Sequence, residues 1–297
     1  MSLARGRLAG TGNQSFGYFG GGWSPSDVAT VDRVDYSNDT GTTPTKGPLS
    51  QGRAFLGATG NASFGYFAGG ESPNRSTIDR VDYSNDTVTA SPKGPLHENR
   101  GGLGAAGNSS FGYFGGGNTK TTVNRVDYSN DTVTASVVGS LTQGRSNVSA
   151  MGNQDFGYFA GGKTPSGPIA TVDRVDYSND TAQASPKGPL SAARDYGAAT
   201  SSRANANPAE ISNLTHYAAG TPATSHFGYL STQSSYGGRK VDRYDYSNDS
   251  ADTSLRGTLP SSGFLEEFAA TGNASFGYFG GGGPSPRTEV TRLNYLN

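Results

Sequence analysis

Cysteine is absent from this sequence, and histidine and tryptophan are scarce, with three and one in 297 residues. Without cysteine the chain cannot form a disulfide, a thiolate metal site or a thiol nucleophile. The histidines, His97, His216 and His226, do not stand at the spacing of metal ligands. We therefore expect neither a cofactor nor a metal ion.

Charge of one sign and long apolar runs are also missing. The net charge is −1 and no run of like charge occurs, so the attraction to phosphate groups on which most nucleic-acid binders depend has no source. No stretch approaches the ~20 apolar residues of a membrane span. The first residues, MSLARGRLAGTGN, lack the apolar core of a signal peptide. A protein or a glycan is the expected ligand.

What the chain does contain is one unit, SFGYFGGG followed by TVDRVDYSND, restated six times about every 45 to 49 residues. An insertion lengthens the fifth copy. The repeats are predicted at about 5–49, 50–96, 97–141, 142–190, 191–259 and 260–297, within a single domain, 1–297. Self-similarity of this period is typical of propellers and solenoids.

The second repeat serves as the template. Residues 53–59 (RAFLGAT) and 63–67 (SFGYF) predict two short strands, and 77–83 (TIDRVDY) a third by its alternation and β-branched residues. Residues 87–91 (TVTAS) predict the fourth, which 92–96 (PKGPL) should end because proline cannot donate to a ladder. Six such units predict an all-β fold, a six-bladed β-propeller of antiparallel blades with the first strands lining the channel.

Several repeated residues are interpreted as structural. A glycine always stands between Phe and Tyr, as at Gly17 and Gly65, which suits a strand pressed against the neighbouring sheet. Asp32, Arg33 and Asp35 recur in the later repeats, so we expect Arg–carboxylate pairing along or between blades rather than a catalytic site. The Ser-Asn-Asp-Thr turns offer oxygens that calcium could use, but turn chemistry accounts for them without an ion.

These repeats resemble the kelch family, in which a second strand ends in Gly-Gly and a tyrosine follows after a variable connector. The counterparts are Gly69-Gly70 with Tyr83, Gly116-Gly117 with Tyr128 and Gly161-Gly162 with Tyr177, while the family's arginine resembles Arg53, Arg100, Arg145 and Arg194. The family's tryptophan after the tyrosine is replaced by Thr43, Ala90, Ala135 or Ala184. The resemblance covers the whole chain and implies a kelch-like propeller.

The repeat sequence, FGYFGGG followed by VDRVDYSNDT, also resembles repeats in proteins of cyanobacterial viruses. That resemblance implies a component of a virion or a cell-surface appendage. It places the protein on a virion or extracellular surface, although the sequence shows no signal peptide and a cytoplasmic location stays open.

Two irregularities interrupt the repetition. About 25 extra residues, 201–225, lie between the first two strands of repeat five and include Ile211, Leu214, His216 and Tyr217. They predict either a plug over the channel or, as we favour, a contact with a neighbouring subunit. The chain also ends after the third strand of repeat six, so the last blade is predicted to lack a fourth strand of its own from that end, leaving an edge that could pair with another strand.

The connectors between second and third strands differ from blade to blade, whereas the turns on the opposite face are nearly identical. Varied loops on a constant scaffold are typical of a binding surface. We expect the ligand on this connector face, with the following contacts: Trp23, Asn74, Arg75, Lys120, Lys163 and Arg287. Trp23 has an alternative role as a packing residue of the rim.

The sequence favours a non-enzymatic binding or assembly module over an enzyme. A pattern present in every blade is a structural device, whereas an active site needs a singular constellation. The alternative is a hydrolase or lyase that acts on glycans, with catalytic groups converging from different blades. An acid, a tyrosine and an arginine within hydrogen-bond reach of one another in one sector would favour that alternative.

Overall fold

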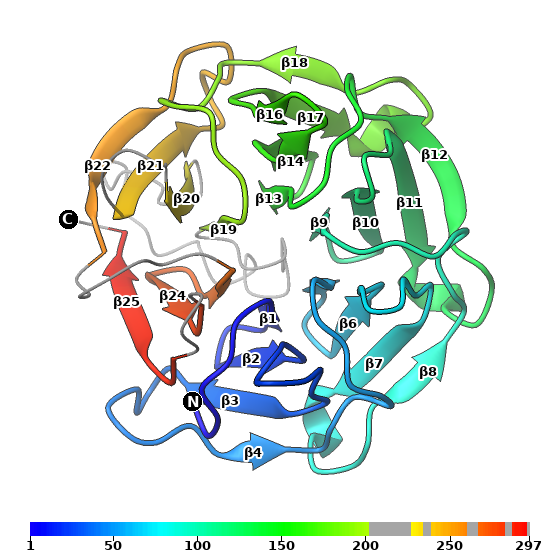
Figure 1. The fold of residues 1–297 in the computed structure, drawn as a ribbon, viewed down its shortest axis with the longest axis vertical. Coiled ribbons are helices and arrows are strands. Elements are labelled where there is room, and N and C mark those ends of the chain that lie inside the picture. The colour runs from blue at the N-terminus through cyan, green and yellow to red at the C-terminus, as the bar shows by residue number, and fades with distance from the viewer. Residues whose placement is uncertain (202–226, 234–238, 260–266, 283–286, 296–297) are drawn as a thin grey trace, which may run out of the picture.

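Small antiparallel sheets are arranged in a ring around one axis (Figure 1). The computed structural model describes residues 1–201, 227–233, 239–259, 267–282 and 287–295. Six sheets make up the ring, which confirms the predicted six-bladed β-propeller.

Five blades have four strands each and the sixth has three among the described residues. The first three blades are β1 (Ala9–Gly12), β2 (Phe16–Gly20), β3 (Val31–Asp35), β4 (Thr45–Lys46); β5 (Gly57–Gly60), β6 (Phe64–Ala68), β7 (Ile78–Asp82), β8 (Ser91–Lys93); and β9 (Leu103–Gly107), β10 (Phe111–Gly116), β11 (Thr122–Asp127), β12 (Ser136–Ser140). The others are β13 (Ser149–Gly152), β14 (Phe156–Ala160), β17 (Val172–Asp176), β18 (Ser185–Lys187); β19 (Ala198–Ser201), β20 (Phe227–Gln233), β21 (Arg239–Asp245), β22 (Ser254–Thr258); and β23 (Ala269–Gly272), β24 (Phe276–Gly280), β25 (Val290–Asn294). A small hairpin, β15 (Lys163–Thr164) with β16 (Gly167–Pro168), projects from the fourth blade.

The fourth strands lie later in the chain than the sequence predicts. In blade two the strand is β8, Ser91–Lys93, not 87–91. The chain first makes a 3-10 turn, η1 (Tyr83–Asn85), with counterparts η2 (Tyr128–Asn130) and η3 (Tyr177–Asn179). Pro92 is tolerated opposite Asp79 because the backbone nitrogen at this position points away from β7. In blade one the corresponding residue is Thr45, and the hydrogen bond to β3 is made by its neighbour, with Arg33 N–H donating to Pro44 O. Hydrogen-bonded and non-hydrogen-bonded pairs alternate along an antiparallel ladder.

The sixth blade has no fourth strand in the described part of the chain, as predicted. The N-terminal residues continue the pattern from the point where that strand would end. The amino group of Met1 donates to Thr288 O, as the N–H of Leu49 donates to Ala29 O in blade one. Met1 therefore lies in the place that Leu49 occupies after β4.

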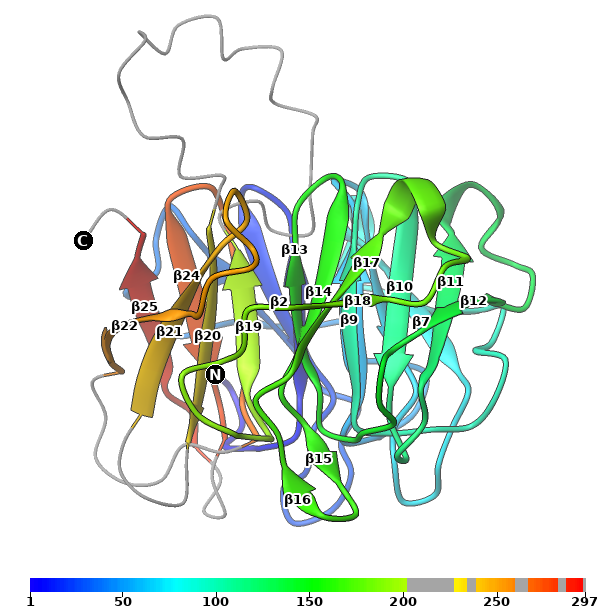
Figure 2. The same cartoon turned by 90° about the horizontal axis from the view of Figure 1, so that it is seen from above.

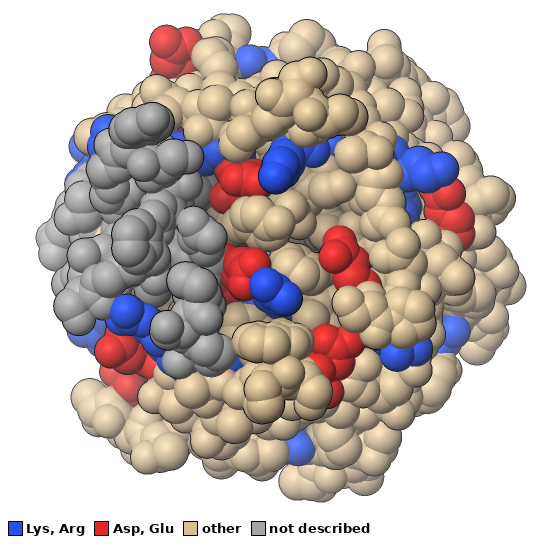
Figure 3. Space-filling view, in the orientation of Figure 1, with Lys and Arg blue, Asp and Glu red and all other residues tan. Residues whose placement is uncertain are grey.

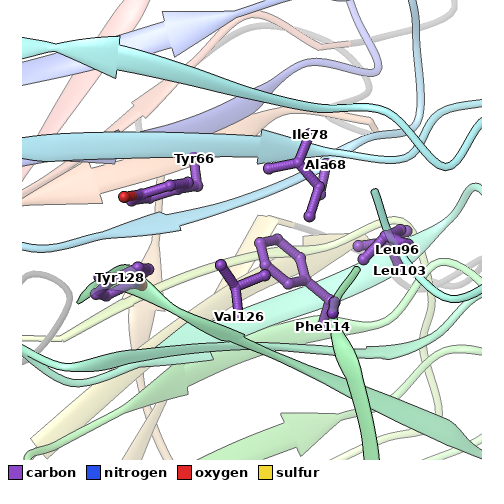
Figure 4. Packing of buried hydrophobic residues seen from close by; sticks show 9 residues of the cluster. Tyr66, Ala68, Ile78, Leu96, Leu103, Phe114, Val126 and Tyr128 are labelled. Carbon is purple, nitrogen blue, oxygen red and sulfur yellow. The ribbon is translucent and has the colours of Figure 1, made fainter. Parts of the chain in front are cut away.

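The hydrophobic core lies between neighbouring blades, because a single four-stranded sheet is too thin to bury its own faces. Figure 4 shows one such layer, in which Tyr66, Ala68 and Ile78 of blade two face Phe114 and Val126 of blade three. Each second-strand tyrosine also stacks on the turn tyrosine of the next blade, with ring centroids 4.5–4.9 Å apart. The pair Tyr278–Tyr36 closes this circle between blades six and one.

The repeated charged residues also join blades, as the sequence predicts. Arg33 donates to Asp86 of the next blade at 2.8 Å, and equivalent pairs recur around the ring. Within a blade, Arg53 pairs with Asp79 at 2.7 Å with both side chains fully buried. The Asp-Arg-Val-Asp strand is thus a structural element in which arginine and carboxylate form charge-assisted hydrogen bonds.

The glycine between Phe and Tyr is required by close packing. A Cβ on Gly65 would lie 2.7 Å from Thr11 Cγ2 of blade one and 2.7 Å from the hydroxyl of Tyr83. Small residues likewise let the first strands approach one another around the channel, where Thr11, Ala58, Ala105 and Ala150 are among the lining residues. The first strands line the channel, as predicted.

The two faces of the disc differ in their loops (Figure 2). The turn face carries the first-to-second turns and the third-to-fourth turns, and the connector face carries the second-to-third connectors, including the β15–β16 hairpin, and the links between blades. The predicted insertion begins after Ser201 at the end of β19, but Ile211, Leu214, His216 and Tyr217 lie outside the described residues.

Candidate functional site

The mouth of the channel on the connector face is surrounded by six residues, one from each blade, that lie one or two positions before the first strands. They differ from blade to blade: Arg7, Phe55, Gly102, Asn147, Tyr196 and Glu267. All six have a positive φ between 53° and 68°. In a chain that otherwise repeats itself, this mouth ring combines one constant backbone conformation with six different side chains.

Backbone hydrogen bonds from blade to blade hold this conformation. Phe55 N–H donates to Arg7 O at 2.8 Å, and Gly102 N–H donates to Phe55 O at 2.8 Å. Arg7 N–H donates to Glu267 O, whose own N–H donates to Tyr196 O at 3.1 Å. A left-handed conformation costs a non-glycine residue roughly 1–2 kcal/mol, and such strain clusters at functional sites when the surrounding structure maintains it.

The side chains of the mouth ring meet across the channel. Phe55 of blade two and Tyr196 of blade five lie with ring centroids 5.9 Å apart. The guanidinium of Arg7 lies 4.7 Å from the centre of the Phe55 ring, and its Nε donates to Glu267 at 2.8 Å. Only a cavity of about 60 Å³ remains at the mouth, which is room for a few water molecules and not for an organic ligand.

Acidic side chains gather around this mouth (Figure 3). Burial raises the pKa of Glu71, an effect that Arg7 opposes and Glu267 reinforces. Burial also raises the pKa of Asp195, which the charge of Lys163 opposes. Partly buried carboxylates beside an arginine and an aromatic pair give this face an electrostatic character that the turn face, with its repeated turns, does not share.

A larger groove leads outward from the mouth between blades one and two. Its volume is about 400 Å³, and its lining residues are Arg7, Trp23, Ser26, Asp27, Gly52, Ala54, Phe55, Ser72 and Arg75. The Arg7 guanidinium lies 5.3 Å from the centre of the half-buried Trp23 ring. Burial raises the pKa of Asp27, against the charges of Arg75 and Arg7. The groove combines aromatic surface with carboxylate, guanidinium and hydroxyl groups.

The structure brings two of the six predicted contact residues together. Trp23 and Arg75 line the groove from different blades. Asn74 is exposed beside Arg75, and Lys120 is exposed and pairs with Glu98 at 3.4 Å. Lys163 is exposed in β15, and Arg287 lies near Glu289, at 3.5 Å, in blade six. The last four residues are thus spread around the connector face rather than gathered at one site.

The mouth ring and Asp27 were not predicted from the sequence. The signal for the ring was present, since the second residue after each repeated arginine of the link differs in every repeat, as at Arg7, Phe55 and Tyr196. The sequence alone does not say that these positions converge at the channel axis.

Within the described residues, no group of three or more His, Asp or Glu side chains could hold a metal ion, and no helix is long and apolar enough to cross a membrane. No protein-family model matches the chain, and no curated protein sequence is similar to it. The propeller fold itself is compatible with a binding or assembly module.

Proposed function

We propose that this protein is a non-enzymatic binding module that recognises a glycan in the groove between blades one and two. The observation that carries the proposal is the concentration of varied side chains at this place on an otherwise repeated scaffold. A repeated framework requires no variation for folding, so the variation of the connector face, where varied residues of two blades line one concave site, is best accounted for by recognition.

The chemistry of the groove suits a sugar ring. A pyranose has a flat face of C–H groups that packs on an aromatic ring, and Trp23 and Phe55 supply such rings. Its hydroxyl groups both donate and accept hydrogen bonds, which the carboxylate of Asp27 and the guanidinium of Arg75 would satisfy. The volume of about 400 Å³ lies within the range of ligand pockets.

A glycan hydrolase or lyase is the second candidate, because partly buried acids with raised pKa are found at catalytic sites. Glu71 and Asp195 are such acids, and Arg7 and Tyr196 lie close to them. Binding is favoured because Arg7 is already engaged by Glu267 and because Tyr196 has Asn147 as its side-chain hydrogen-bond partner. The small cavity at the mouth also leaves no room for a sugar beside Tyr196.

The biological setting follows from the sequence resemblances alone. We propose a kelch-like propeller on a virion or a cell-surface appendage, where recognition of a glycan or of a neighbouring subunit is the ordinary task. Repeats that resemble those of viral proteins support this setting, and the connector face supplies the surface with which the protein would contact its host.

The proposal is tested with the full-length protein on a glycan array, followed by titration of the best ligand against the fluorescence of Trp23, the single tryptophan. The Trp23→Ala variant lacks this reporter, so the affinities of the variants are measured by calorimetry. Trp23→Ala and Arg75→Ala should each weaken binding about tenfold or more, as expected for central contacts.

Asn85→Ala, in an exposed turn on the opposite face of blade two, is the matched control and should bind like the wild type. Loss of binding in Asn85→Ala but not in Trp23→Ala would place the ligand on the wrong face for this proposal. Release of new reducing ends or unsaturated sugars from the bound glycan would establish the enzymatic alternative instead.

A further inference from the structure

The outer edge of β25 is the one blade edge in the described chain that no fourth strand covers. In blades one to five the third strand pairs with a fourth on this side, as β7 pairs with β8. Every residue of β25 is at least partly exposed, whereas three of the five residues of β7 are buried. An open edge of this kind presents backbone groups on which another strand can pair.

The filled blades show what a fourth strand contributes beyond the ladder. Asp86, in the turn of blade two, accepts from three groups of blade one. Tyr18 and Arg33 donate to its Oδ2 at 2.9 and 2.8 Å, and Lys46 of β4 approaches its Oδ1 at 3.1 Å. Equivalent lysines, Lys93 and Lys187, approach Asp131 and Asp249 at 3.6 and 3.3 Å.

The junction between blades six and one has only part of this arrangement. Tyr278 and Arg292 donate to Oδ2 of Asp39 at 2.8 and 2.9 Å, but no described lysine approaches Oδ1. The Arg292 side chain is 52% exposed, against 23% for Arg33 in a filled junction. At Asp180, the corresponding aspartate between blades three and four, only Tyr113 and Arg125 donate to the carboxylate among the described residues, although a fourth strand is present. A cation at Oδ1 of Asp39 would repeat the contacts that Lys46, Lys93 and Lys187 make in the other filled junctions.

Two backbone groups of blade one are incomplete at the same junction. In filled junctions Gly47 N–H donates to Asp86 O and Ala90 N–H donates to Pro48 O, both at 2.8 Å. The corresponding groups are Asp39 O and the N–H of the buried Thr43, and no described residue makes these bonds. Buried backbone groups are nearly always paired. An extended chain bound in the slot between β25 and the turn of blade one would provide a partner for both groups.

We propose that this slot binds an extended segment of a partner polypeptide that carries a lysine followed by glycine and proline. By the register of blades one and two, the lysine lies opposite Val290 and the residue two before it lies opposite Arg292. The lysine pairs with Oδ1 of Asp39, and the segment ends beside Met1, which occupies the place of Leu49. The contact is independent of the proposed glycan groove.

A partner, not a second copy of this chain, is the occupant. The chain's own segments of this type, which contain Lys46, Lys93 and Lys187, are each paired within their own blade. If one molecule donated such a segment to blade six of another, it would expose an edge in one of its own blades, so the number of open edges would not fall.

The test uses a fluorescein-labelled, C-terminally amidated peptide with the sequence of residues 88–95, VTASPKGP, titrated with the full-length protein by fluorescence anisotropy. Saturable binding is expected. Arg292→Pro should abolish it, because Arg33 N–H donates to the fourth strand in blade one and Arg292 has the same place in blade six. Asp39→Asn should weaken binding about fivefold, the effect of losing one partly exposed ion pair.

The matched control is Asp86→Asn, which alters a filled junction and should leave peptide affinity unchanged. Replacing the peptide lysine by alanine should weaken binding to the wild type about fivefold but hardly to Asp39→Asn, because the two changes remove the same contact. Thermal melts by circular dichroism establish that each variant is folded. Absence of saturable binding, or equal effects of Asp39→Asn and Asp86→Asn, would overturn the proposal. Self-association that the peptide reverses would instead identify a second copy as the occupant.

Discussion

Asn124 is the residue at which the buried charge pattern of the blades is broken. Arg5, Arg53, Arg145 and Arg194 each pair with an aspartate of their own blade. Arg100 is equally buried, but the aspartate position is Asn124, and the guanidinium donates instead to the carbonyls of Phe114, Gly116 and Thr122. Burial lowers the pKa of Arg100 to about 10, against the charge of Glu98.

Asn124→Asp is expected to stabilise the protein, because it supplies the counter-ion that a fully buried guanidinium lacks. The free energy of unfolding at neutral pH should rise by about 2 kcal/mol, measured by urea denaturation. The reverse change in an intact pair, Asp79→Asn, should lower it by about 3 kcal/mol. Equal or lower stability of Asn124→Asp would mean that the three carbonyls already satisfy Arg100.

At the scale of one element, the second strand of each blade is positioned by its glycine. Gly65→Ala is expected to lower the free energy of unfolding by about 1–3 kcal/mol, because the new Cβ would overlap Thr11 and Tyr83. Gly41→Ala is the control, since nothing lies within 4 Å of a Cβ there and its φ is not in the left-handed region. Thermal melts of both variants provide the comparison, and similar melting temperatures would contradict the packing argument.

The fourth strand shows why one element was placed incorrectly from the sequence. Residues 87–91 alternate and contain valine and threonine, which is typical of a strand. In the structure Val88 is exposed, and the pairing partner of β7 is the Ser-Pro-Lys segment that follows. Tertiary contacts decide here, since Lys93 reaches Asp131 of the next blade and Leu96 enters the core between blades. No local pattern contains that information.

At the scale of the whole molecule, the junction between blades six and one lacks, among the described residues, backbone hydrogen bonds that the fourth strands and their links make in blades one to four. We expect hydrogen exchange of the backbone amides to be faster for Arg292 and Thr43 than for Arg80 and Ala90, because the latter pair with a fourth strand or its link. Native-state exchange followed by mass spectrometry measures this difference. Uniform protection around the ring would show that the open edge does not lower local stability.

The circle of tyrosines makes the molecule sensitive to base. Burial raises the pKa of Tyr36, Tyr177 and Tyr246 well above the ordinary value. The folded state thus holds the phenolic protons more tightly than the unfolded state. The resulting stability is fully present below about pH 10 and is lost as the pH rises further.

Tyrosinate absorbance should therefore appear in one cooperative step together with loss of the β-sheet signal in circular dichroism. It should not rise gradually from the ordinary phenol pKa onward. A gradual titration with the fold intact would contradict the burial of these rings.

The propeller could be predicted because its cause is repeated six times in the sequence, so that a single unit with four strand patterns determines the architecture. The face of the candidate site could also be predicted, since variation among connectors is visible in the sequence, and Trp23 and Arg75 do line one groove. The convergence of Phe55 and Tyr196 could not, because their contact depends on blades two and five lying opposite each other across the channel.

The constant backbone of the mouth ring allows this molecule to present different side chains from one fixed scaffold. Blade-to-blade hydrogen bonds join five of the six positions, and all six share one backbone conformation whatever side chain they carry. The side chains can therefore be exchanged without redesigning the loops that present them. A new combination at the six positions would alter the chemistry at the axis while leaving the disc intact. Diversity in such a protein would then arise by substitution of side chains at six fixed backbone positions rather than by changes in loop structure.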